Sequence, residues 1–239
     1  MKRIIALLKP KQGLLTVLLV FIVCFSFAQS KHAECGCPKS TFDNTKADTI
    51  FRLSNGKTIA LCGYRDKDIA EQDGKLFFSE FVLSVCGDNK IIKFWGAVEE
   101  CQLRVVKDTL LVETMVNLPT GKNMAFKWTV WTIEHIYFVK GKPVKDFAVN
   151  RQIPKYNQQQ MASALKQYEQ AKKEISDANM EISDKLFISA ISGSQKARSY
   201  LSAFKYRFGV LDGAYAEWYN DVMRMLKLWD TNIPSQDNF

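Results

Sequence analysis

The chain has 239 residues, of which 47% are hydrophobic, 12% aromatic and 24% charged. This composition is typical of a globular protein and excludes a disordered or collagen-like chain. The formal net charge is +8, but residues 1–28 contain four basic residues and no acidic one. Residues 29–150 and 151–239 each carry a net charge of only +2. No basic block or stripe of the kind that binds nucleic acid is present, and we expect no nucleic-acid partner.

The first 28 residues resemble a secretory signal peptide. A basic segment (residues 1–12) precedes an apolar run, and the small residues Ser26 and Ala28 follow it. This pattern predicts cleavage after Ala28 and export to the bacterial periplasm or exterior. A retained anchor is the alternative, but the run from Gly13 to Ala28 is shorter than the roughly 20 apolar residues that span a bilayer. A lipoprotein is a further alternative, and Cys24 lacks the small preceding residue that lipidation requires.

The next part of the chain has the alternation of β-strands. The segments 48–53 and 57–64 flank Asn55-Gly56, which is a strong hairpin signal. Further strands are predicted at 76–86, 91–97, 101–106, 110–116 and 144–149, with one long strand or two short ones in 123–139. Seven to nine strands at this spacing predict an antiparallel β-sandwich or a barrel-like sheet.

From about Pro154 the periodicity becomes helical. Apolar residues recur at spacings of three, four and seven from Met161 to Ile182, and Glu-Ile-Ser-Asp occurs at both 174–177 and 181–184. We interpret that stretch as one amphipathic helix. Ser194 and Asp212 are predicted to cap two further helices, the first ending at Gly209.

The predicted fold class is therefore α+β, with a C-terminal antiparallel helical region packed against the sheet. We divide the chain into a signal peptide (1–28), a cysteine-containing arm (29–47), a β-rich domain (48–152) and a helical region (153–239).

Five cysteines remain after cleavage, and all lie in the first half of the mature chain: Cys35, Cys37, Cys62, Cys86 and Cys101. An exported protein meets an oxidising environment, so we predict disulfides among them. Because five is odd, at least one thiol stays free, pairs between chains or binds a ligand, and spacing does not select the pairing.

Few residues are candidates for chemistry. His32, Cys35 and Cys37 form a short Cys/His segment that could bind a metal or exchange disulfides, but we favour a disulfide-tethered arm. His135 is the one candidate catalytic histidine, but its neighbour Glu134 points to the opposite face of a strand. Adjacent Glu99 and Glu100 diverge in the same way and do not form a glycosidase pair. We expect no cofactor.

The sequence therefore favours a non-catalytic binding protein of the cell envelope over an enzyme. Its partner would be a protein or a surface polymer, as for an inhibitor or an immunity-like protein, with no membrane span left after cleavage. Such a partner predicts an exposed aromatic or acidic patch. The alternatives are a secreted hydrolase of unrecognised type, which would need His135 in a wet cleft, and a metal or redox role for His32, Cys35 and Cys37.

Overall fold

The computed structural model describes residues 35–38, 46–66, 77–88, 90–97, 99–209 and 211–231. The predicted signal peptide, His32 and part of the predicted arm lie outside these described residues.

The N-terminal part forms one antiparallel sheet of eight strands, which confirms the predicted α+β class. The strands are β1 (Thr49–Arg52), β2 (Thr58–Asp66), β3 (Phe77–Val85), β4 (Lys90–Trp95), β5 (Glu100–Val106), β6 (Thr109–Leu118), β7 (Lys127–Val139) and β8 (Lys142–Val149). Their order is β1-β2-β3-β5-β6-β7-β8, and β4 pairs with β3 beside this path. The predicted Asn55-Gly56 hairpin joins β1 to β2, with Gly56 at a φ of +79° that favours glycine.

The sheet curls strongly enough to enclose a core of its own. Leu61 of β2, Trp95 of β4 and Ile136 of β7 belong to one buried apolar cluster although their strands are not neighbours. The rings of Phe81 and Trp95 stack at 4.8 Å inside it. A bulge between Gly63 and Tyr64 brings β2 very close to β3, where a Cβ at Gly63 would lie 2.4 Å from the Phe81 Cβ. Glycine is therefore required at this bend.

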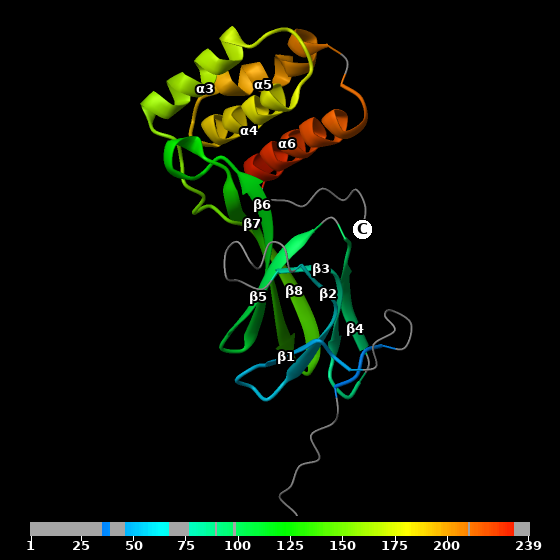
Figure 1. Ribbon diagram of the computed structural model, residues 1–239. Coiled ribbons are helices and arrows are strands. Elements are labelled where there is room, and N and C mark those ends of the chain that lie inside the picture. The colour runs from blue at the N-terminus through cyan, green and yellow to red at the C-terminus, as the bar shows by residue number, and fades with distance from the viewer. Residues whose placement is uncertain are drawn as a thin grey trace, which may run out of the picture.

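Four α-helices follow the sheet: α3 (Gln158–Gln170), α4 (Asp177–Ile191), α5 (Gln195–Phe208) and α6 (Gly213–Thr231). A short 3₁₀ turn, η1 (Lys122–Met124), lies between β6 and β7. Figure 1 shows the helices as a layer at one end of the sheet, beyond the upper ends of β6 and β7. Ser194 caps α5, and Gly209 follows its last residue, as predicted.

The prediction of one helix across residues 174–184 was wrong. Ser176 caps the start of α4 by accepting a hydrogen bond from the backbone of Asn179. The Asn179 side chain in turn donates to the carbonyls of Lys172 and Glu174 and thereby fixes the link from α3. A polar side chain that bonds to nearby backbone groups competes with helix continuation, which explains the break. Helix α4 is buried on nearly all sides and is not amphipathic.

A second core holds the helices together and joins them to the sheet. Trp131 of β7 packs edge-on against Phe187 of α4 and stacks with Trp229 of α6, with ring centroids 5.6 and 6.2 Å apart. The Arg151 guanidinium lies over the Trp229 ring, 4.5 Å from its centroid. The helices therefore pack against the sheet, as their aromatic residues predict, but they cover its end.

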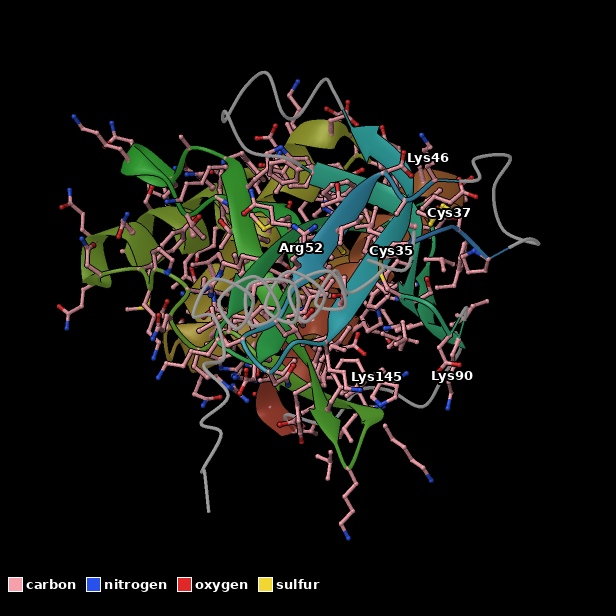
Figure 2. All side chains as sticks on the ribbon, turned by 90° about the horizontal axis from the view of Figure 1, so that it is seen from below. Cys35, Cys37, Lys46, Arg52, Lys90 and Lys145 are labelled. Atoms are coloured by element: carbon pink, nitrogen blue, oxygen red, sulfur yellow. A yellow bond between two sulfur atoms is a disulfide. The ribbon has the colours of Figure 1, made fainter. Side chains whose placement is uncertain are left out.

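Two disulfides fix the N-terminal arm on the outer face of the sheet (Figure 2). They join Cys35 to Cys86 and Cys37 to Cys62, with Cα–Cα distances of 4.8 and 5.7 Å. Cys101 is the free cysteine among the described residues and is buried. Of the five predicted candidates, four are therefore paired and one is not.

We expect loss of the Cys37–Cys62 disulfide to lower the free energy of unfolding. The bond closes a separation of 25 residues, and a loop of this length corresponds to about 3–4 kcal/mol in the chain-entropy treatment. Urea unfolding of C37S/C62S against the parent measures it. Alkylation followed by peptide mapping should label Cys101 only after denaturation. Labelling of Cys37 or Cys62 in the unreduced protein would contradict this pairing.

Candidate functional site

Five titratable side chains influence one another around Glu99, and we call them the junction cluster: Lys93, Glu99, Cys101, Glu134 and Arg224. Lys93 Nζ of β4 and Glu134 Oε2 of β7 form an ion pair of 2.9 Å in the concave face of the sheet. Their side chains are only 18% and 12% exposed. Lys93 also lies over the Trp95 ring, 4.7 Å from its centroid.

Burial dominates the electrostatics of this cluster. It raises the pKa of Glu99, against the lowering influence of Lys93 and Arg224, while the charge of Glu134 acts in the same direction as burial. Burial, assisted by Glu99, also raises the pKa of the Cys101 thiol to about 12. Cys101 is therefore a neutral thiol at physiological pH and a poor nucleophile. Arg224 of α6 acts on Glu99 only through its charge, because its ion pair is with Asp221 of the same helix, and we find no activated group in the cluster.

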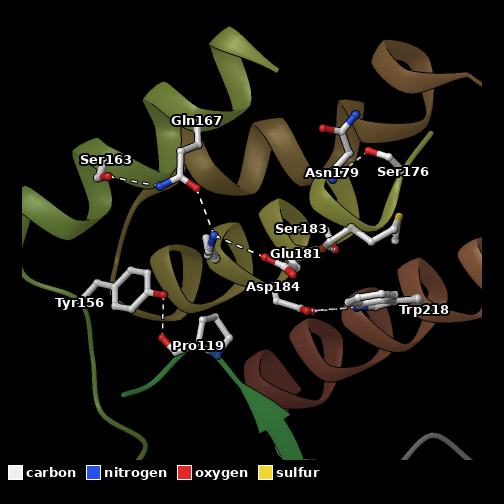
Figure 3. A network of polar contacts seen from close by, with 12 residues as sticks. Pro119, Tyr156, Ser163, Gln167, Ser176, Asn179, Glu181, Ser183, Asp184 and Trp218 are labelled. Atoms are coloured by element: carbon white, nitrogen blue, oxygen red, sulfur yellow. Dashed lines mark hydrogen bonds and ion pairs between the residues drawn. The ribbon is translucent and has the colours of Figure 1, made fainter. Parts of the chain in front are cut away.

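A second polar network lies inside the helical layer (Figure 3). Asp184 of α4 is 3% exposed, and the Trp218 Nε1 of α6 donates to both of its carboxyl oxygens at 3.1 Å. Burial raises the pKa of Asp184 to about 7, although the bond from Trp218 lowers it. Nearby, the hydroxyl of Tyr156 donates to the Pro119 carbonyl at 2.7 Å and links the helical layer to the end of β6.

The candidate residue His135 is not part of either cluster. It lies opposite Leu111 of β6 and Asp146 of β8, while Glu134 pairs across the concave face with Lys93. Its Nδ1 is buried and has no hydrogen-bond partner among the described residues. Asp146 is exposed, and its carboxylate accepts from the backbone of Phe147. No acid of the described chain therefore orients this nitrogen for general-base catalysis.

The cysteines of the candidate metal or redox segment are used in the disulfides. Cys35 and Cys37 bond to Cys86 and Cys62, so their sulfurs are not thiolates in this structure. Among the described residues, no three His, Cys, Asp or Glu side chains lie together in a way that could hold a metal ion.

The exposed apolar residues of the sheet are the features that sequence reasoning missed. Ile91 and Phe94 of β4 are 44% and 48% exposed. Ile91 pairs with Ser84 and Phe94 with Val82, and a register shift in between puts both on the same outer face despite their spacing of three residues. Alternation alone would have separated them, so only the bulge reveals the pair.

No protein-family model, no curated protein and no solved structure matches this chain. None of the helices in the described residues is long and apolar enough to cross a membrane.

A double-mutant cycle on K93M and E134Q should give a coupling free energy of about 1–3 kcal/mol, because both partners are largely withdrawn from water. The control pair, Lys196 and Glu169, has a similar N–O distance of 2.7 Å but is exposed. We expect its coupling to be smaller and weakened by salt. Urea unfolding of the four proteins in each cycle gives both numbers. Equal coupling free energies in the two pairs would contradict the expectation that burial strengthens the Lys93–Glu134 ion pair.

The stability of the protein should fall as the pH rises from about 4 to about 7. The pKa of Asp184 is raised from 3.8 to about 7 in the fold, so in this window the folded state holds a proton that the unfolded chain has lost. The D184N variant keeps an uncharged side chain and should remove this slope. At pH 8 the D184N variant should therefore unfold with a higher free energy than the parent, by at most about 4 kcal/mol, since one pKa unit is worth about 1.4 kcal/mol.

The measurement is urea unfolding between pH 4 and pH 8. D177N, at the exposed start of the same helix, is the control for loss of one carboxylate and should retain the wild-type slope. A wild-type slope in D184N would contradict the assignment to Asp184.

Proposed function

We propose that the chain is an exported, disulfide-stabilised protein of the bacterial envelope that binds a protein partner and catalyses no reaction. The observation that carries the proposal is the outer face of β4, where Ile91 and Phe94 are exposed side by side. An apolar pair of this kind is a small version of the anchors that protein interfaces use.

The position of β4 strengthens this proposal. The strand pairs with β3 along one edge, and no strand of the described chain pairs along its other edge. A strand from a partner can be added along this edge, while exposed side chains provide specificity. The Cys35–Cys86 disulfide anchors the arm at the end of β3, next to the turn into β4. A partner would therefore meet a surface that is already rigid, which limits the entropy lost on binding.

Export is supported by the leader and by the disulfides together. Bonds between Cys35 and Cys86 and between Cys37 and Cys62 form in oxidising compartments and are rare in the cytosol. The free thiol of Cys101 does not support a catalytic role, because it is buried and has a pKa of about 12.

Site-specific photocrosslinking tests the partner. A photoreactive amino acid replaces Phe94 in the full chain expressed in a bacterial host, and the same amino acid replaces Tyr206 as the control. Tyr206 is 92% exposed on α5, in the helical layer. We expect a discrete adduct from position 94 that is absent from position 206, and roughly tenfold less adduct when Ile91 is also changed to Lys, since a buried charge opposes docking.

Two results would overturn the proposal. Adducts of equal yield at both positions would indicate random collision. The absence of any adduct at position 94 in the host envelope would exclude a protein partner at this face of β4. The mass of the purified protein tests export separately, since a chain that begins at Gln29 is expected and a chain that retains Met1 contradicts cleavage.

A further inference from the structure

Four hairpin turns lie at the end of the sheet opposite the helices (Figure 1). They connect β1 to β2, β3 to β4, β5 to β6 and β7 to β8. Three of them adjoin. The backbone N–H of Ser54 donates to the carbonyl of Lys107 at 3.1 Å, and Lys57 Nζ lies 5.8 Å from the centre of the Phe138 ring. We call this end of the molecule the hairpin end.

Positive charge is concentrated on the hairpin end. Its turns and the strand residues beside them carry three acidic residues, Asp88, Asp108 and Asp146, against seven exposed basic ones: Arg52, Lys57, Lys90, Lys107, Lys140, Lys142 and Lys145. Figure 2 looks at the molecule from this side and labels three of them, Arg52, Lys90 and Lys145. None of the seven forms an ion pair with another described residue, whereas six ion pairs occur elsewhere in the described chain.

Apolar side chains accompany these charges at the tips. Val106 precedes Lys107 and is 41% exposed, and Val139 precedes Lys140 and is 47% exposed. Both lysines have a positive φ, 54° for Lys107 and 50° for Lys140. Glycine or asparagine adopts this conformation with less strain, so lysine is a costly choice for the turns. Each of these two turns nevertheless has a lysine at its tip, next to an exposed valine.

We infer that the hairpin end docks on an anionic lipid surface, with Val106 and Val139 entering the interface and the lysines meeting lipid phosphates. Six of the seven basic residues are lysines, whose flexible point charges suit a diffuse anionic surface better than one defined anion. An acidic polymer would satisfy the charges but would give the two valines no apolar medium to enter. This inference concerns a different surface from the outer face of β4 and does not depend on the proposed partner there.

Vesicle co-sedimentation tests the inference with the full chain, expressed and purified in oxidised form. The probes are vesicles of phosphatidylcholine alone and vesicles with 30% phosphatidylglycerol, a composition on the order of an anionic membrane surface. We expect binding to the anionic vesicles that falls steeply with salt. K107Q/K140Q/K142Q should weaken it on the order of 100-fold, at about fivefold per lysine. V106S/V139S should weaken it roughly tenfold at constant salt.

The matched control is K166Q/K172Q/K173Q, which removes three exposed lysines from α3 and the link after it, at the opposite end of the molecule. It has the same net charge as the hairpin variant and should bind nearly like the parent. All variants share one N-terminus, so the differences between them report on the hairpins, and urea unfolding verifies that each is folded.

Three outcomes would overturn the inference. Equal loss in the two triple-lysine variants would show a response to net charge alone, and equal binding to neutral vesicles would exclude charge recognition. Wild-type binding by V106S/V139S, with full competition by a soluble polyanion such as dextran sulfate, would assign the hairpin end to an acidic polymer. Failure of the crosslinking at position 94 would leave the vesicle result unchanged, so the two proposals fail independently.

Discussion

The curl of the sheet is the constraint on which the rest of the structure depends. Strands β4 and β7 are far apart in the strand order, yet Lys93 and Glu134 form an ion pair of 2.9 Å because the sheet bends round to face itself. The same bend encloses the apolar core that contains Trp95 and Ile136. A flat sheet of these strands would leave one face without cover, whereas the curled sheet buries its concave face and needs the helices only at its end.

The curl also determines what stays exposed. Strand β4 leaves the main path of the sheet because β5 takes over pairing with β3 at Phe78 and Cys101. Strand β4 therefore has an edge with which no described strand pairs, and the shift in its register turns Ile91 and Phe94 to the same side. At the hairpin end, the β1–β2 turn contacts the β5–β6 turn, where the Ser54 N–H donates to the Lys107 carbonyl. The two surfaces to which we assign binding are thus consequences of how the sheet closes.

Local signals in the sequence predicted many of the strands and helices. Features that depend on contacts between residues distant in the sequence could not be predicted in this way. Asn55-Gly56 identified a hairpin and Ser194 a helix start, because each acts on the backbone beside it. The break before α4 escaped prediction, since it depends on the Asn179 side chain reaching back to Lys172 and Glu174. The junction cluster escaped too, because Lys93 and Glu134 are 41 residues apart in the chain. Disulfides were expected from the predicted export, but their pairing required the register of β2 with β3.

The distribution of charge also differs between the sequence and the folded chain. Residues 29–150 and 151–239 each have a net charge of +2, which gives no indication of a basic surface. Because the strands run antiparallel, however, alternate turns fall at the same end, and lysines spread from residue 57 to residue 145 are gathered there. Two interior carboxylates have partners inside the fold: Asp184 accepts from Trp218, and Glu134 pairs with Lys93. These contacts join β4 to β7 and α4 to α6, while none of the seven cations of the hairpin end forms an ion pair with a described residue. Recognition by this protein is therefore expected at its surface, where charge and apolar side chains are displayed together.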